Sequence, residues 1–363
     1  MDSSVWRVRQ GRARAAMAAA GTDVMLLSVG ADLPYFTGYE AMPLERLTML
    51  VLVRDADATL VVPELEAPRV IADGSFTIRP WPEGADPISI VAELAGAAPR
   101  VAIGDLTWTR FTLALQTALP DARFTPANLI TAPLRSVKDA AEVDALRAAA
   151  LAVDAVAVEM RARPFGGRTE AEVSRELVDR MLERGHQRAN FAIVGSGPNG
   201  ASPHHDAGDR VIQSGDVVVC DFGGTMNGYC SDTTRMFVVD APSPEVADTY
   251  DALAEAQGRA VRAATVGTSC AEVDAVARRS LSEYGLAEAF MHRIGHGIGL
   301  EAHEDPYLVA GNTTPLAAGH AFSIEPGVYF PGRFGMRLED IVVASDTGPE
   351  SLNVSPHDLA VVE

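Results

Sequence analysis

Three of the eight histidines in this 363-residue chain lie in one short stretch, His292-Arg-Ile-Gly-His296-Gly-Ile-Gly-Leu-Glu-Ala-His303. Imidazole is a frequent ligand of divalent metals, so a metal site is the first hypothesis for this stretch. Glycines on either side of His296 let the backbone approach a neighbour closely, because glycine has no Cβ. The same glycines argue against a helix, so the four-residue spacing of His292 and His296 does not by itself place both on one metal.

Two aspartates flank a strong turn signal, Asn227-Gly228. Both central positions of a type I′ turn need positive φ, which these residues tolerate, so the sequence predicts a two-residue β-hairpin. In the register that this turn sets, Asp221 faces Thr234. Asp232 faces Gly223, so both acids lie on one sheet face as diagonal neighbours, about 7–8 Å apart at Cα. The hairpin leaves two readings open: the acids share a cation, or both are solvated on an open face.

A second pair of acids lies on a second expected hairpin. We expect its strands over residues 321–330 and 336–345, with the turn at Pro331–Gly335. A register that pairs Tyr329 with Gly335 puts Glu325 directly opposite Glu339. Each glutamate alone could be a surface residue at a strand edge. Four acids among apolar strand residues instead favour a cation site, because buried carboxylates are costly without a counter-charge.

A family resemblance rests on these residues and their flanks. The set Asp221, Asp232, His296, Glu325 and Glu339, with GHGIGL around the histidine and ED at the last glutamate, resembles the metal-binding set of the pita-bread metallopeptidases. Within that superfamily, Ser196-Gly-Pro-Asn, His204, His303-Glu-Asp-Pro and Met336-Arg-Leu-Glu-Asp resemble the Xaa-Pro peptidases, prolidase and aminopeptidase P. The resemblance covers nearly all of the chain.

The resemblance implies two divalent metal ions. Asp221 would bind the first metal, and Asp232 and Glu339 would bridge both. His296 and Glu325 would complete the second. One nitrogen among carboxylate oxygens suits Mn²⁺ as the expected metal, with Co²⁺ and Zn²⁺ as alternatives.

The resemblance also implies catalytic roles. Glu325 would accept the proton of the attacking water and pass it toward the leaving nitrogen, which is general acid–base catalysis. His204 and His303 would donate hydrogen bonds to the substrate oxyanion. Arg337 would orient the substrate or the neighbouring acids, and His292 would support the metal site.

The implied activity is hydrolysis of Xaa-Pro bonds in dipeptides, with the aminopeptidase P reaction on longer peptides as the alternative. Many dipeptidases of this family carry an arginine after the histidine–glutamate motif to bind the free carboxylate of a dipeptide. This chain has Tyr307 in that loop and no lysine or arginine from Glu304 to Glu325. His320 or a residue of a partner subunit could substitute, so the length of the substrate stays open.

Two other functional classes compete with the peptidase hypothesis. A creatinase-like or other small-molecule hydrolase or lyase uses the same fold, and a third possibility is a binding scaffold without catalysis. Both would be marked by loss of the metal ligands. All five are present here, which disfavours both alternatives.

The elements that must carry these residues suggest two domains. Helical and strand-like segments alternate over residues 1–135, which predicts a smaller α/β, creatinase-like N-terminal domain. The remaining residues, 136–363, predict an α+β pita-bread catalytic domain. We expect its helices at residues 138–163, 169–184, 244–266 and 269–284.

The net charge and the amino-acid composition exclude several classes of binding partner. The net charge of −19 argues against binding to nucleic acid or an anionic membrane surface. No apolar run approaches the roughly 20 residues of a membrane span. Three cysteines without CxxC spacing indicate neither a disulfide framework nor a thiolate zinc site, and they fit a cytoplasmic protein. The expected partners are proline-containing dipeptides or short peptides, and the family resemblance implies a homodimer.

Overall fold

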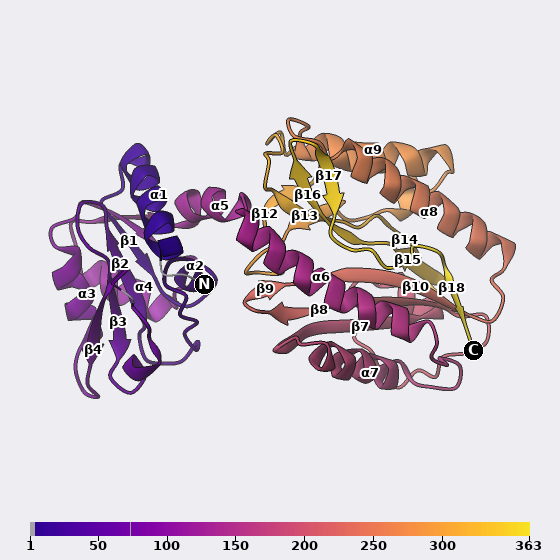
Figure 1. Cartoon of the computed structure of the whole chain (residues 1–363), viewed down its shortest axis with the longest axis horizontal. Coiled ribbons are helices and arrows are strands. Elements are labelled where there is room, and N and C mark those ends of the chain that lie inside the picture. The colour runs from indigo at the N-terminus through magenta and orange to yellow at the C-terminus, as the bar shows by residue number, and fades with distance from the viewer. Residues whose placement is uncertain (1–3, 73) are drawn as a thin grey trace. The chain divides into compact units, whose positions relative to one another are not determined.

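The chain folds into two compact units, Met1–Arg135 and Ser136–Glu363 (Figure 1). A computed structural model describes residues 4–72 and 74–363. No helix within these residues is both long and apolar enough to cross a membrane. Each unit has its own apolar core.

The first unit is a six-stranded mixed sheet with helices, in the strand order β4-β3-β2-β1-β5-β6. Its elements are α1 Ser4–Ala20, β1 Val24–Leu27, α2 Asp32–Thr37, β2 Met49–Val53, β3 Thr59–Pro63, the 3₁₀ helix η1 Ala67–Arg69, β4 Thr77–Trp81, α3 Pro87–Ala95, β5 Arg100–Ile103, α4 Thr109–Ala118, β6 Arg123–Pro126 and α5 Asn128–Ser136. Helices α3 and α4 bury Val91 and Leu115 against strand residues such as Leu26. This is the α/β unit that the alternating pattern predicts.

The second unit contains two five-stranded sheets and a separate strand pair. Its helices are α6 Ala140–Met160, α7 Glu170–Glu183, η2 Gly197–Ala201, α8 Pro244–Ala263, α9 Cys270–Glu283 and η3 Ala287–Ala289. Its strands are β7 Arg188–Ser196, β8 Val217–Met226, β9 Tyr229–Cys230, β10 Thr233–Val239, β11 Gly295–Gly297, β12 Glu304–Leu308, β13 Ala321–Ile324, β14 Gly327–Phe330, β15 Phe334–Arg337, β16 Asp340–Ser345, β17 Gly348–Ser351 and β18 Ala360–Val362.

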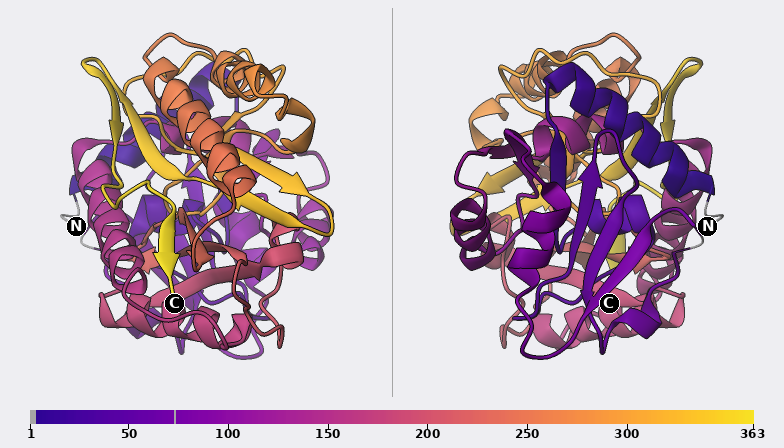
Figure 2. Two further views of the ribbon diagram at one scale, coloured as in Figure 1. Left: turned by 90° about the vertical axis from the view of Figure 1, so that its right-hand side faces the viewer. Right: turned by 90° about the vertical axis from the view of Figure 1, so that its left-hand side faces the viewer.

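Each of these two sheets packs against one pair of helices, and α6 also contributes Leu146 and Ala150 to a cluster with Ile341 and Val343 of the second sheet. The sheet β18-β10-β8-β7 packs against α6 and α7 through apolar side chains that include Val156 and Phe237. The sheet β12-β11-β13-β16-β17 packs against α8 and α9, with Leu253 and Phe322 in the shared core. Figure 2 shows α8 and α9 in orange beside the yellow strands of this second sheet. The two helix-covered sheets form the α+β, pita-bread-like arrangement expected from the sequence.

The first predicted hairpin is confirmed. Asn227 and Gly228 have φ of 51° and 86°, as a type I′ turn requires. Asp221 on β8 pairs with Thr234 on β10. Asp232 lies in the short break between β9 and β10, directly before the first paired residue of β10. The turn chemistry therefore set the register that brings the two aspartates to one part of the sheet.

The second hairpin has the expected register, but the prediction of two uninterrupted strands was wrong. The chain forms β13 and β14 on one side, and β15 and β16 on the other. Pro326 interrupts the first strand because proline has no N–H for the ladder. Ile324 still pairs with Asp340 and Tyr329 with Gly335, so Glu325 and Glu339 lie at the break between the two strand pairs.

The turn of this hairpin is also shorter than predicted. Phe330 pairs with Phe334, which leaves only residues 331–333 between the strands. Glycine at 332, with φ of 75°, takes the left-handed conformation in the turn. The expected turn over residues 331–335 included two residues that belong to the strand.

Candidate metal centre

The structure brings all five residues of the expected metal-binding set together. Their ligand atoms fall into groups within 4.8 Å of one another, and these groups are Asp221–Asp232–Glu339, His296–Glu325–Glu339 and Asp232–His296–His303. Asp232, His296 and Glu339 each belong to two of the groups. His303, expected to face the substrate, therefore also lies near enough to this cluster to approach a metal, with its ring centroid 3.8 Å from that of His296.

The acids of the cluster repel one another strongly. Burial raises the pKa of Asp232 well above its usual range, and the carboxylates of Glu339 and Asp221 raise it further. Burial likewise raises the pKa of Glu339, and the carboxylates of Glu325 and Asp221 raise it further. The pKa of Glu325 rises to about 7, again mainly through burial. Such a cluster stays ionised only with positive charge close by.

One carboxylate oxygen has no partner within the described part of the chain. Asp221 accepts a hydrogen bond from Arg337 at 2.5 Å through Oδ2. Its other oxygen, Oδ1, is buried without a hydrogen bond. An unpaired buried oxygen beside three more carboxylates and one imidazole fits a hard divalent cation, which prefers oxygen ligands.

His296 presents one nitrogen to the acids. Its Nδ1 lies 3.1 Å from the carbonyl oxygen of Gly297 and donates to it, which leaves the Nε2 lone pair exposed to the cluster. Nε2 lies 3.3 Å from Glu325 Oε1 and 3.7 Å from Asp232 Oδ2. Burial, with the neighbouring His303, lowers the pKa of His296 to about 3, so this imidazole is neutral and available as a ligand.

The glycines beside His296 are needed for close strand packing. A Cβ on Gly295 would lie 1.9 Å from the carbonyl oxygen of Ser323 on β13. A Cβ on Gly297 would lie 2.3 Å from the carbonyl oxygen of Asp305 on β12. The expected close approach is therefore confirmed, and the approaching groups are the backbones of neighbouring strands.

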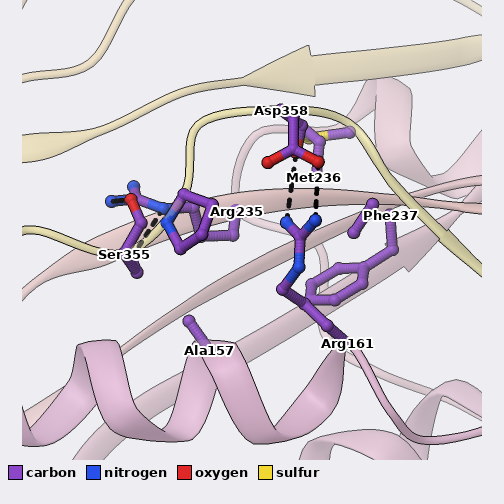
Figure 3. A pocket seen from close by; sticks show the side chains of 9 residues that line it. Ala157, Arg161, Arg235, Met236, Phe237, Ser355 and Asp358 are labelled. Atoms are coloured by element: carbon purple, nitrogen blue, oxygen red, sulfur yellow. Dashed lines mark hydrogen bonds and ion pairs between the residues drawn. The ribbon is translucent and has the colours of Figure 1, made fainter.

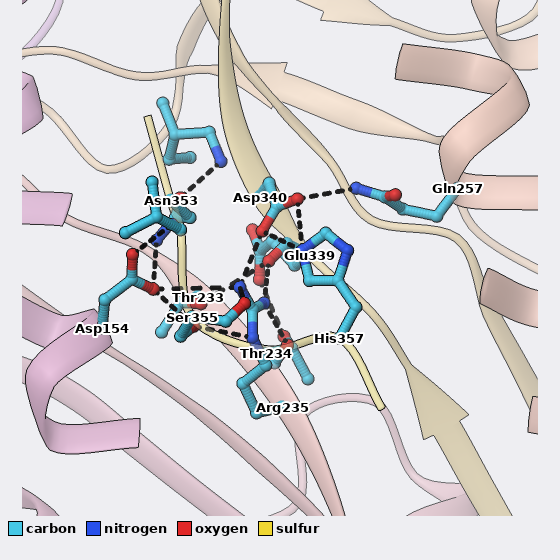
Figure 4. A network of polar contacts seen from close by, with 12 residues as sticks. Asp154, Thr233, Thr234, Arg235, Gln257, Glu339, Asp340, Asn353, Ser355 and His357 are labelled. Atoms are coloured by element: carbon cyan, nitrogen blue, oxygen red, sulfur yellow. Dashed lines mark hydrogen bonds and ion pairs between the residues drawn. The ribbon is translucent and has the colours of Figure 1, made fainter. Parts of the chain in front are cut away.

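A buried polar network holds Glu339 from behind (Figure 4). Thr234 Oγ1 donates to Glu339 Oε2 at 2.7 Å. Arg235, 4% exposed, donates to the backbone oxygen of Glu339 at 2.6 Å and to Asp340 Oδ1 at 2.8 Å. Asp340 also accepts from Gln257 at 3.0 Å. This network fixes the backbone at the strand break where Glu339 projects.

The small cavity beside the same arginine is too small for a substrate. It measures about 10 Å³, and its lining includes Arg235, Met236 and Ser355. That volume is roughly the space for one water molecule. Figure 3 shows Arg161 and Asp358, which also line it, joined by an ion pair whose shortest distance is 2.6 Å. A substrate must therefore bind elsewhere.

The metal cluster instead opens into a much larger cavity, of about 930 Å³. Its apolar lining residues are Phe191, Ile193, Pro203, Met291 and Val309. His204, His303 and Arg337 line the same cavity, as expected for residues that act on a substrate. His320 does not: it is 6% exposed and its Nδ1 accepts from the backbone N–H of Ala317. The suggestion that it anchors a substrate is therefore wrong for this conformation.

Arg337 connects the acids to a chain of hydrogen bonds. Its guanidinium donates to Asp221, to Thr234 Oγ1 at 3.1 Å and to the hydroxyl of Tyr329 at 2.7 Å. The hydroxyl of Tyr329 donates in turn to His292 Nε2 at 2.9 Å. Burial lowers the pKa of His292 to about 4, with Arg337 adding to the effect, so this imidazole is neutral.

A buried glutamate holds the loop that carries His204. Glu170 accepts hydrogen bonds from Ser196 Oγ at 2.6 Å, from Asn199 Nδ2 at 3.1 Å and from His205 Nε2 at 2.8 Å. Burial raises the pKa of Glu170, but these hydrogen bonds outweigh it, and the pKa lies below the usual range. The Ser-Gly-Pro-Asn motif thus serves to anchor the loop.

Sequence reasoning did not find several of these residues. Glu170 lies in a helical first turn, where acids are common, so it carries no separate signal. Arg235 and Tyr329 are strand residues whose partners come from distant segments. Arg293 lies inside the histidine-rich stretch itself. The only indication of a role for it is its positive charge among residues that otherwise suit a metal site.

Two helix-covered sheets with a carboxylate–histidine cluster define a metal-dependent hydrolase. The chain belongs to metallopeptidase family M24, whose model matches residues 144–346. The creatinase/prolidase N-terminal domain matches residues 9–137. The protein is therefore a metallopeptidase, and its site suits divalent metal.

Particular relatives are dipeptidases. A probable dipeptidase PepE of Mycobacterium tuberculosis is 42% identical, over 99% of this chain and 98% of its own. The solved dipeptidase PepE of Mycobacterium ulcerans is 46% identical and superposes with a TM-score of 0.94, covering 100% of this chain and 99% of its own. A prolidase of Thermococcus sibiricus is 34% identical, with a TM-score of 0.93 and complete coverage of both chains.

Proposed function

We propose that this metallopeptidase hydrolyses the bond before proline in Xaa-Pro dipeptides, using two divalent metal ions. The observation that carries the proposal is the set of overlapping ligand groups, in which Asp232, His296 and Glu339 each belong to two groups. Four carboxylates match the charge of two divalent cations. Relatives named dipeptidase and Xaa-Pro dipeptidase support the choice of substrate.

In this proposal Asp221, Asp232, His296, Glu325 and Glu339 hold the metals. When bound, a metal pair supplies an acidified water as the nucleophile and polarises the scissile carbonyl. Mn²⁺ is the metal we propose, because oxygen ligands dominate, with Co²⁺ and Zn²⁺ as alternatives.

The chain's own residues handle protons and charge. Glu325, whose buried carboxyl has a pKa near 7 in the absence of metal, is placed to accept a proton from water and return it to the leaving nitrogen. His303 is neutral, since burial and the charge of Arg293 lower its pKa, and it can donate a hydrogen bond to the oxyanion. We assign His204 the same role, because it lines the cavity beside the acids.

Arg337 orients Asp221 in this proposal. Its guanidinium makes four hydrogen bonds, all to groups of the protein, so it is a positioning residue for the metal-binding acid. The apolar lining, which includes Phe191 and Val309, suits a proline ring, which has no N–H to recognise.

The alternative is aminopeptidase P activity, removal of the first residue from longer peptides. The large, open cavity favours it, and so does the absence of lysine and arginine from Glu304 to Glu325. A creatinase-like or other small-molecule reaction is a more remote alternative, and the complete ligand set argues against it.

Hydrolysis of Ala-Pro, Ala-Pro-Ala and Ala-Ala by the Mn²⁺-supplemented protein tests the proposal. Cleavage of Ala-Pro alone supports the dipeptidase, whereas preference for Ala-Pro-Ala supports the aminopeptidase. Cleavage without dependence on proline refutes both. Metal analysis after dialysis gives a separate reading, since the proposal expects two divalent ions per chain.

We further propose a cytoplasmic homodimer whose two domains are the compact units 1–135 and 136–363. The three cysteines, all unpaired and buried, support a reducing compartment. The dimer rests on family resemblance, and light scattering of the purified protein tests it.

A further inference from the structure

Arg293 is a cation of the large cavity that the metal centre does not use. It lines the cavity together with His303 and Val309. Its Nη2 lies 3.4 Å from His303 Nδ1. Its guanidinium carbon lies 4.5 Å from the centre of the Tyr307 ring, in a cation–π arrangement. These two contacts hold the guanidinium at one place in the cavity.

No carboxylate of the described chain forms an ion pair with this arginine. The guanidinium contacts the imidazole and the aromatic ring, neither of which carries negative charge. Arg337, the other guanidinium of the cavity, is engaged by Asp221, Tyr329 and Thr234. Arg293 therefore keeps most of its five N–H donors for a ligand, and such a fork matches a carboxylate in two parallel hydrogen bonds.

Arg293 lies where the terminal carboxylate of a dipeptide substrate could reach it. His303 separates it from the metal cluster, since a ligand atom of His303 lies within 4.8 Å of those of Asp232 and His296. In a dipeptide only the nitrogen and Cα of the last residue separate the scissile carbonyl from the terminal carboxylate. A dipeptide whose last residue lies on the His303 side of the cluster thus carries its terminal carboxylate toward Arg293.

Tyr307 gives this arginine its support. Strand β12 pairs Tyr307 with His296 on β11, so the ring stands beside the metal ligand rather than in a free loop. Tyr307 stands at the position where many dipeptidases of the family carry an arginine. Here its ring instead supports Arg293, which comes from the histidine-rich stretch.

We propose that Arg293 binds the C-terminal carboxylate of the substrate and so makes this enzyme a dipeptidase. The inference rests on the proposed function and deepens it by naming the group that measures substrate length. A longer peptide places a neutral amide against Arg293 and loses the ion pair with a carboxylate.

The test compares Ala-Pro with its amide, Ala-prolinamide, which differs only at the terminal carboxylate. With the Mn²⁺-loaded protein, we expect kcat/KM to favour Ala-Pro by about 10- to 100-fold, the range for hydrogen bonds between charged groups. Arg293→Met should raise KM for Ala-Pro by that factor and leave the kinetics of Ala-prolinamide within about threefold, so that the preference disappears. Arg293→Lys, which keeps the charge without the fork, should restore part of it.

Binding of free proline and prolinamide, measured by calorimetry on the same Mn²⁺-loaded proteins, gives a readout independent of turnover. The wild-type protein should bind proline more tightly, and Arg293→Met should bind the two alike. Arg279→Met is the matched control: it removes the same charge from the surface of α9, where Arg279 is 60% exposed. It should keep the full preference for the free carboxylate.

The outcomes separate the two proposals. A wild-type protein that cleaves neither substrate refutes the proposed function, and the inference falls with it. A wild-type protein that cleaves Ala-Pro, combined with an Arg293→Met variant that keeps the preference, refutes only the role of Arg293. Equal losses on both substrates also refute that role, because they mark an effect through His303. Circular dichroism and metal content establish that each variant is folded and loaded.

Discussion

Replacement of Glu325 by glutamine should stabilise the metal-free protein while abolishing turnover. In the folded, metal-free protein the pKa of Glu325 rises from 4.5 to about 7, mainly through burial. A carboxyl with a raised pKa in the folded state contributes its full stability below pH 4.5 and loses it as the pH rises toward 7. Glutamine does not titrate, so the two proteins should diverge over that window.

The size of the effect follows from linkage. Because one pKa unit corresponds to about 1.4 kcal/mol, the rise in the pKa of Glu325 from 4.5 to about 7 amounts to about 3 kcal/mol at pH 7 and above. The side chain is 15% exposed, so solvent screens little of it. For a unit of this size, about 3 kcal/mol corresponds to a rise in Tm of roughly 6–12 °C. Glutamine Oε1 can still accept the hydrogen bond that Ser323 donates to Glu325 at 3.1 Å.

The assay must report on the catalytic unit. All three tryptophans lie at positions 6, 81 and 108, so tryptophan fluorescence follows only the N-terminal unit. Calorimetry in a chelator at pH 4.5, 6 and 7.5, with hydrogen exchange of peptides from residues 136–363, serves instead. Glu288→Gln makes the same change at an exposed position and should show no divergence.

Metal provides the second half of this experiment. Saturating Mn²⁺ should reverse the order of stability, because glutamine is the weaker ligand and the variant gains less from binding. Turnover of Ala-Pro should fall by at least 100-fold with metal retained. A metal-free variant that is no more stable than the wild-type protein at pH 7.5, or a loaded variant with near-normal turnover, would refute the reasoning.

Three further predictions follow from contacts around the centre. Glu170→Gln should lower the free energy of unfolding by about 2–4 kcal/mol and lower kcat, because the amide NH2 of glutamine would face donors from Ser196, Asn199 and His205. Urea titration measures the change in stability, and an unchanged midpoint contradicts the prediction. Burial lowers the pKa of His320 to about 4, so stability should fall by up to about 3 kcal/mol as the pH falls from 6.5 through 4. His320→Asn should remove that slope in chelator-treated protein, and an equal slope in both proteins argues against it. Gly295→Ala should weaken Mn²⁺ binding and cost about 1–3 kcal/mol, since its Cβ would meet the backbone of β13 at 1.9 Å; unaltered binding in a metal titration counts against the packing argument.

The residues of the two hairpins predicted how most of the acids of the site are positioned. Asn227-Gly228 admits one tight turn, and this turn fixed the partner of Asp221. The register expected for the second hairpin placed Glu325 across from Glu339, and it survived the interruption of both strands. Turn residues and strand alternation act over a few positions, so strand pairing within a hairpin can be predicted from a short segment of sequence.

The order of the metal-binding residues also carried information beyond geometry. The five-residue set and its flanks indicated the family, and the family model over residues 144–346 confirmed it, as did a relative 42% identical over 99% of the chain. The metals, the proton shuttle and the oxyanion donors remain predictions, because neither sequence nor contacts record a reaction.

The sequence by itself thus determined the registers of the two hairpins and the acids that they carry. Only the tertiary structure decided which groups meet across hairpins: Thr234 with Glu339 and Asp221 with Arg337. These contacts join segments far apart in the chain, and they form because two sheets and their covering helices bury apolar faces together. Burial of that kind depends on the whole fold, so no short stretch of residues specifies it.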